Sequence, residues 1–127
     1  MLTAIGANSA NELLHWFYTR DYPRDRIAAF APLVDQVAAE GDAVARSVLQ
    51  GAAQQLAALV SSVRAQLFAP GTPVYVATIG GVFTSQAVAG WFRTLVELEP
   101  GSTVGPPRHE PAYGALLTAM GTADERR

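Results

Sequence analysis

The chain has 127 residues, of which 50% are hydrophobic and 16% are charged, and its formal net charge is −2. This length and composition predict a single globular domain over residues 1–127 with a modest core, and they exclude an intrinsically disordered chain. The basic residues are scattered and form no stripe, so we expect no nucleic-acid partner. The absence of cysteine excludes disulfides, thiolate metal sites, cysteine-ligated iron–sulfur clusters and a cysteine nucleophile.

The first residues, Met1–Gly6, lack the basic segment and the long apolar stretch of a signal peptide. No apolar run approaches the roughly 18–20 residues that span a bilayer. We therefore expect a soluble, cytoplasmic protein without a membrane partner.

Helices are predicted through the first half of the chain. Ser9 followed by Glu12 matches a capping box and predicts a short first helix. A second helix is predicted over residues 24–40, and Gly41 is typical of the residue that ends a helix. Asp42 is then the expected N-cap of a third helix.

The third helix has the clearest periodicity in the sequence. Its apolar residues recur at spacings of three and four: Ala45, Val48, Leu49, Ala52, Leu56, Leu59, Val60, Val63 and Leu67. Gly51, in the middle, costs roughly 1 kcal/mol relative to alanine. Close approach of another backbone and simple tolerance of the glycine both explain it.

The most informative feature is a pair of glycines, Gly80 and Gly81, between an apolar strand and a helix. Residues 73–79 form a continuous apolar run, which predicts a strand covered on both faces. A helix is predicted over residues 84–96. Proteins use this arrangement to bring backbone close to a nucleotide or phosphate, although a tight turn that needs residues without a Cβ explains the same pair.

The remaining elements leave the predicted sheet incomplete. A short second strand is predicted at Thr103–Val104, and the helical crossover before it would make the two strands parallel. A last helix is predicted over residues 112–121, followed by a flexible, solvated tail over residues 122–127. Because a two-stranded parallel sheet is not normally stable by itself, the sequence predicts part of a larger α/β unit.

Three segments resemble one known family, in the order in which that family has them. They are residues 27–34 with Gly41-Asp42 and the long helix, residues 79–85, and residues 106–117. Together they resemble the C-terminal portion of the BadF/BadG/BcrA/BcrD ATPase and N-acetylglucosamine kinase family, which belongs to the actin-like, sugar-kinase and Hsp70 superfamily. The resemblance implies a mostly helical α/β fold: a partial ribonuclease-H-like C-terminal lobe with a long central helix and a small parallel sheet.

The resemblance also implies a nucleotide site. The glycine pair is similar to the family's adenosine motif, so Gly80 and Gly81 would allow close approach of ATP. Val82 and Ser85 would lie beside the nucleotide, and Gly114 would face the same cleft. No catalytic or metal-binding residue is expected in this chain. The alternative is that Gly80, Gly81 and Gly114 serve turns and helix packing only.

The chain also departs from the family pattern. Family members carry an Asp-Gly-Gly-Gly-Thr type loop, a catalytic aspartate, a sugar site and a Gly-Thr-Gly-Ser type phosphate loop, none of which is present in this sequence. Phosphoryl transfer depends on those parts. The resemblance therefore implies the C-terminal lobe of an ATP-dependent sugar (N-acetylglucosamine-like) kinase or ATPase, inactive alone, with Mg²⁺ bound mainly by the N-terminal lobe.

Two further expectations concern partners and histidines. An unpaired strand edge favours either an N-terminal lobe, fused or supplied in trans, or self-association as a homodimer. A free-standing helical interaction or assembly module, with structural glycines only, is the alternative function. His15 is interpreted as a packing residue and His109 as a loop residue near the cleft, and neither predicts a metal site.

Overall fold

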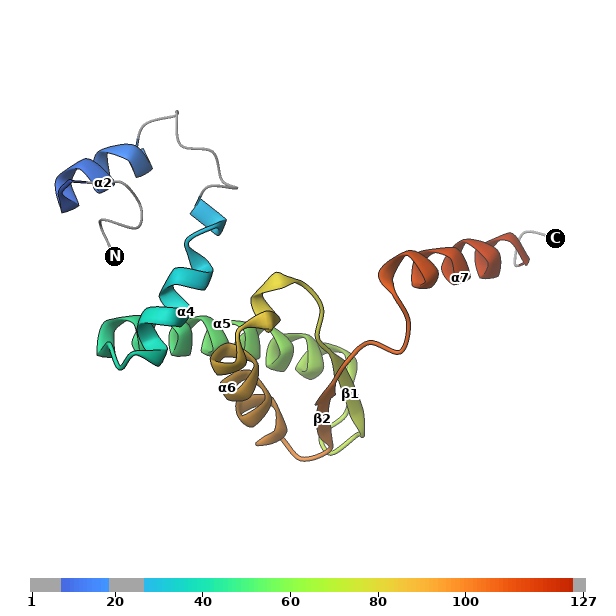
Figure 1. Ribbon diagram of the computed structural model, residues 1–127. Helices are drawn as coiled ribbons and strands as arrows, with labels where there is room; N and C mark the ends of the chain where they lie inside the picture. Colours follow the sequence, from blue (N-terminus) through green and yellow to red (C-terminus); the bar gives the residue numbers. More distant parts are fainter. Residues whose placement is uncertain (1–7, 19–26, 125–127) are drawn as a thin grey trace.

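The computed structural model describes residues 8–18 and 27–124. In Figure 1 the long helix α5 runs through the centre with α4, α6 and the sheet around it, while α2 and α7 extend away at opposite ends of the view. The elements are α2 (Ala10–Tyr18), α4 (Ala31–Ala39), α5 (Ala43–Leu67), β1 (Val74–Ala77), the 3₁₀ helix η1 (Gly81–Thr84), α6 (Gln86–Glu97), β2 (Ser102–Gly105) and α7 (Pro111–Asp124). The predicted fold class, mostly helical α/β with a long helix and a small parallel sheet, is confirmed.

Local capping signals correctly predicted where helices begin and end. The Ser9 hydroxyl accepts a hydrogen bond of 3.1 Å from the Glu12 backbone N–H. The Asp42 carboxylate accepts one of 2.8 Å from the Ala45 N–H at the start of α5. Gly41, with φ +108°, turns the chain between α4 and α5.

The predicted second helix is wrong in its extent. Its first residues, 24–26, lie outside the described part of the chain. Residues 27–28 are helical as predicted, but residues 29–30 form a turn that interrupts the helix, and α4 begins at Ala31. The reason is Pro32, which lacks a backbone N–H and whose ring clashes with the carbonyl four residues earlier, so that proline is tolerated only in the first turn of a helix.

Only one of the two apolar stripes of α5 lies in the core. The buried residues of α5 are Ala45, Leu49, Ala53, Ala57 and Arg64, and they face Val88, Phe92 and Val96 of α6 and Ala38 of α4. The small side chains of Ala45, Ala53 and Ala57 leave room for α4 and α6 to pack against α5. An added Cβ at Gly51 would meet nothing within 4 Å, so no close backbone approach requires this glycine.

The second apolar stripe of α5 is exposed. Its members are Val48, Leu59, Val63 and Leu67, whose exposed fractions are 55%, 64%, 53% and 69%. They belong to the same apolar periodicity in the sequence as the buried Ala45 and Leu49. A helix rich in alanine offers apolar side chains over more than half of its circumference, so periodicity does not select the buried face.

The sheet consists of β1 and β2, which pair in parallel from Val74↔Ser102 to Ala77↔Gly105. Val76 and Val104 pack against the core from the same face of the sheet. Tyr75 lies on the opposite face and is 49% exposed. The predicted second strand and its direction are confirmed, whereas coverage of the first strand on both faces is wrong, because α5 and α6 cover only one of them.

Arg64 connects the end of α5 to the turns before both strands. Its side chain is 2% exposed and its Nε donates to the Glu99 carboxylate at 2.8 Å. Its Nη2 donates to the carbonyls of Thr72 at 2.8 Å and Pro100 at 3.0 Å. This one side chain therefore holds the turns that precede β1 and β2 against the C-terminal end of α5.

The last helix is longer than predicted. It extends from Pro111 through Asp124, and residues 125–127 lie outside the described part, so the flexible tail over residues 122–127 stays a prediction. Within the described ranges, no helix combines the length and the apolar character that crossing a membrane requires.

Candidate functional site: the glycine turn and the start of α6

The predicted site lies where the two parallel strands end. β1 ends at Ala77 and β2 at Gly105, its register partner, and the Thr78 N–H donates to the Gly105 carbonyl at 3.0 Å. After this point β1 continues into the glycine turn, and β2 continues into the segment 106–111. The carboxyl edge of parallel strands is where open α/β sheets bind ligands.

Gly80 adopts a backbone conformation that only glycine adopts readily. Its dihedral angles are φ +103° and ψ 163°. An added Cβ would meet nothing within 4 Å at either Gly80 or Gly81. The turn therefore requires Gly80 for its conformation, whereas neither conformation nor packing in the described structure requires a glycine at position 81.

The residues after the glycine pair hold the turn on the core. The ring of Phe83 packs edge-on against Phe92 of α6 with centroids 5.1 Å apart. The Thr84 hydroxyl donates to the Gly81 carbonyl at 2.6 Å. Val82 lies between these anchors and is 55% exposed. Gly80, Gly81 and Val82 are therefore exposed to solvent, while Phe83 and Thr84 hold the turn in place.

Ser85 begins α6 and contacts α4. Its hydroxyl accepts a hydrogen bond from the Val88 N–H at 3.2 Å, and it donates one of 2.6 Å to the Asp35 carboxylate. The carboxylate of Asp35 therefore lies near the N-terminus of α6, where a negative charge is favourable. No local pattern in the sequence signals this contact, because Asp35 and Ser85 are 50 positions apart.

Two hollows are lined by residues that precede or follow the glycine turn in the chain, and neither is lined by Gly80, Gly81, Val82 or Ser85. One, of about 360 Å³, begins at Gln86 and Ala87 directly after Ser85; its other lining residues are Asp35, Ala38, Ala39, Arg46 and Trp91. The second, of about 420 Å³, contains Ile79 directly before Gly80, and its other lining residues are Pro107, Arg108, His109, Glu110 and Pro111. Both volumes fall in the range of small-molecule sites.

Of the predicted site residues, the structure brings together Gly80, Gly81, Val82 and Ser85. Gly114 lies in α7, which projects away from the glycine turn in Figure 1, and an added Cβ there would meet nothing within 4 Å. Its place in the cleft stays a prediction. His109, whose ring packs 4.7 Å from that of Tyr113, lines the second hollow as a loop residue.

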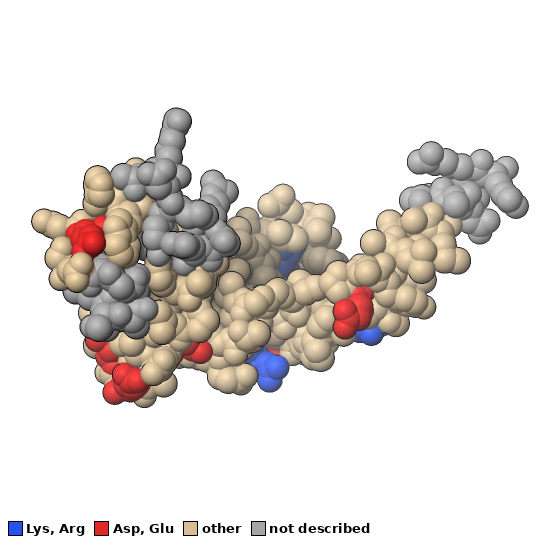
Figure 2. Space-filling view, turned by 45° about the horizontal axis from the view of Figure 1, so that its top comes forward, with Lys and Arg blue, Asp and Glu red and all other residues tan. Residues whose placement is uncertain are grey.

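Charged side chains form no continuous patch on the face that Figure 2 shows. In Figure 2 the acidic and basic groups are scattered over the visible face without a continuous patch of either sign. Among the described residues, no group of three or more histidine, aspartate or glutamate side chains is placed to hold a metal ion.

A comparison with known protein families identifies the chain. The model of the BadF/BadG/BcrA/BcrD ATPase family matches residues 3–119 of 127. The chain belongs to this family. Membership in the BadF/BadG/BcrA/BcrD ATPase family indicates an ATP-binding function of the kinase or ATPase type. No curated protein matches the chain.

Proposed function

We propose that this chain is the C-terminal lobe of an ATP-dependent sugar kinase or ATPase, with an N-acetylglucosamine-like acceptor. In this proposal the glycine turn and the start of α6 form the adenosine side of the ATP cleft. An N-terminal lobe, fused or separate, supplies the acceptor site and most of the Mg²⁺ ligands. The chain alone transfers no phosphoryl group.

The glycine at position 81 is the observation that carries the proposal. The described structure supplies no conformational or packing reason for glycine there, and the space in front of it is open. Gly81 lies beyond the carboxyl edge of the parallel strands, and Ile79 before the turn and Gln86 after it each line a hollow. Close approach of a flat ligand to the backbone explains this combination.

Charge favours adenosine over phosphate at this position. Helix N-termini commonly bind phosphate, but Asp35 already lies at the start of α6, with its carboxylate 2.6 Å from the Ser85 hydroxyl. A second anion beside the Ser85 hydroxyl would be repelled by this carboxylate, while Arg46, the one cation that lines the hollow, donates from its Nε to the Ala38 carbonyl at 3.0 Å. Neutral adenine and ribose groups, which can donate hydrogen bonds to a carboxylate, suit the hollow beside Asp35, where Trp91 offers an aromatic surface.

The test is nucleotide binding by the pure chain, followed by amide chemical shifts. We expect ATP and adenosine to shift resonances of residues 79–88 and to compete with each other, and pyrophosphate not to compete. Gly81→Val should weaken binding at least tenfold, since its side chain would fill the open space. Gly51→Ala is the matched control, because it also adds carbon where nothing lies within 4 Å.

Either of two results would remove the proposal: no shifts at millimolar ATP, or pyrophosphate competing where adenosine does not. The first of these would favour the alternative function, a helical interaction module with structural glycines. The exposed apolar stripe of α5 supports this alternative, since Leu59 and Leu67 are more than half exposed.

A further inference from the structure

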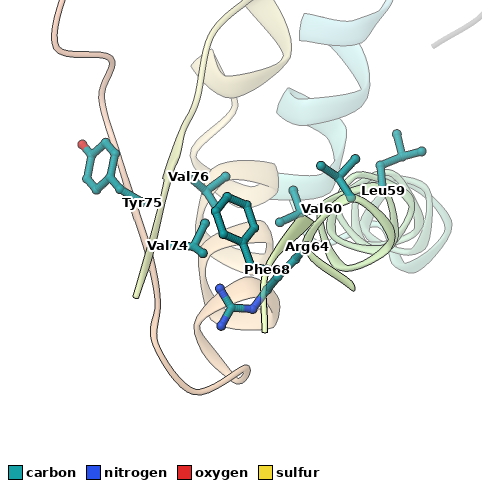
Figure 3. A pocket seen from close by; sticks show the side chains of 8 residues that line it. Leu59, Val60, Arg64, Phe68, Val74, Tyr75 and Val76 are labelled. Atoms are coloured by element: carbon teal, nitrogen blue, oxygen red, sulfur yellow. The ribbon is translucent and has the colours of Figure 1, made fainter. Parts of the chain in front are cut away.

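The hollows of the described structure differ in the polar groups that they offer to a ligand. In the hollow of Figure 3, between α5 and β1, the charged lining residue is Arg64, which is 2% exposed and paired with Glu99. Tyr75 points to the other face of the sheet, and its hydroxyl donates to the Pro106 carbonyl at 2.7 Å. The hollow of about 360 Å³ that Asp35 lines, here called the Asp35 hollow, instead contains a carboxylate that can accept further hydrogen bonds.

One oxygen of the Asp35 carboxylate is engaged and the other is not. The Ser85 hydroxyl donates to Oδ1 at 2.6 Å, and this bond holds the carboxylate between α4 and the start of α6. Among residues 8–18 and 27–124, no other group donates to Asp35 and no cation pairs with it. A carboxylate has about four lone-pair sites. Asp35 therefore has acceptor positions left for a ligand, above all at Oδ2.

The one cation that lines the Asp35 hollow does not neutralise this carboxylate. Arg46 donates from its Nε to the Ala38 carbonyl at 3.0 Å, and within the described ranges it forms no ion pair. Gln86 is the remaining polar lining residue, and its amide can both donate and accept. Hydrogen bonds to a charged acceptor are the stronger ones, so this hollow favours a ligand with neutral donor groups.

The apolar side of the Asp35 hollow includes an aromatic ring. Ala87 and Trp91 lie four residues apart, on the same face of α6. Trp91 is partly buried, since it packs against the core and also lines the hollow. Along the helix axis it lies about 9 Å from Ser85, because an α-helix rises about 1.5 Å per residue. This separation of carboxylate and ring is comparable to the length of a nucleoside.

We propose that Asp35 binds the ribose hydroxyls of the nucleotide while Trp91 stacks on its base. Two carboxylate oxygens suit a vicinal diol, because the 2′- and 3′-hydroxyls each donate one hydrogen bond; an acidic residue binds ribose in this way in dinucleotide-binding folds. The edge of adenine suits a carboxylate less well, since a ring nitrogen that accepts lies next to the amino group that donates.

Asp35 is then a specificity-determining residue that favours ribonucleotides over 2′-deoxyribonucleotides. This inference rests on the proposed function, in which adenosine lies at the start of α6. It adds the part of the nucleotide that each side of the hollow recognises.

Nucleotide analogues test the inference on the unmodified chain. We expect 2′-deoxy-ATP and 3′-deoxy-ATP each to bind roughly tenfold more weakly than ATP, since each lacks one hydroxyl that donates to the carboxylate. Fluorescence reports on the base, because Trp16→Phe leaves Trp91 as the single tryptophan of the chain. Adenosine should quench this fluorescence, whereas ribose 5-phosphate should not.

Asp35→Asn tests whether the carboxylate is the source of the preference. This variant should bind ATP roughly tenfold more weakly and change the affinity for 2′-deoxy-ATP by less than about threefold, so that the preference almost disappears. Glu40→Gln is the matched control, because it removes the same charge at an exposed position directly after α4, outside the hollow. It should leave the preference unchanged.

The possible results separate this inference from the proposed function. No binding of ATP by the pure chain would remove both. Equal affinity for ATP and 2′-deoxy-ATP, or a preference that Asp35→Asn retains, would overturn the role of Asp35 and leave the adenosine cleft in place. Binding of GTP that is tighter than that of ATP and depends on Asp35 would also overturn it, because the carboxylate would then pair with the donors of a guanine base.

Discussion

The Ser85 hydroxyl donates a 2.6 Å hydrogen bond to the Asp35 carboxylate while it caps α6 through the Val88 N–H. One side chain thus fixes the start of α6 and connects it to α4. The glycine turn lies immediately before this contact. The position of the candidate nucleotide site therefore depends on a contact between residues 50 positions apart.

This contact predicts coupled effects on stability. Ser85→Ala should lower the free energy of unfolding by about 1–2 kcal/mol, since it removes an N-cap and the bond to Asp35. Asp35→Ala should lower it by about 1 kcal/mol. Urea unfolding of the double variant should show a loss smaller than the sum by about 0.5–1.5 kcal/mol. Strict additivity would contradict the coupling.

Arg64 is expected to be the most sensitive charged residue. Arg64→Met removes the ion pair with Glu99 and leaves the carbonyls of Thr72 and Pro100 without their donor. Because Glu99 is 41% exposed and can return to water, we expect a loss of about 3 kcal/mol, mainly from the two carbonyls. Thermal unfolding measures it. Arg93→Met, at an exposed position of α6, should change stability by less than about 0.5 kcal/mol.

Two glycine-to-alanine substitutions should act in opposite directions. At Gly101, with φ +86°, the added Cβ would lie 2.8 Å from the Thr72 carbonyl oxygen, and neither backbone can move easily. We expect a loss of about 2–3 kcal/mol. Gly51→Ala, inside α5 with open space around it, should raise stability by about 0.5–1 kcal/mol. Denaturant midpoints of both variants provide the comparison, and a destabilising Gly51→Ala would show a neighbour absent from this structure.

The pure chain should be inactive as a kinase. Phosphoryl transfer requires positioned phosphates, bound metal and an oriented acceptor, and the proposal assigns these to the N-terminal lobe. A coupled assay of ADP release with N-acetylglucosamine should show no sugar-dependent rate. A sugar-dependent rate that survives repurification would contradict the lobe assignment while leaving membership in the ATPase family intact.

Sequence alone determined the features that depend on neighbours within about four residues. Ser9, Gly41 and Asp42 were correctly assigned as caps, and the long helix and the parallel pair of strands were both predicted. Capping bonds and turn dihedrals are local, so the residue types that favour them are visible in a linear reading. The glycine turn was found for the same reason.

Only the tertiary structure decided which apolar surfaces are buried and which residues meet the glycine turn. Periodicity did not distinguish Leu49, which is buried, from Leu59, which is exposed, because the alanine-rich α5 is apolar on more than one face. The contacts of Asp35 with Ser85 and of Arg64 with Glu99 join residues 50 and 35 positions apart. Such contacts depend on how helices pack, and packing is set by the combined shape of several elements and not by any one segment.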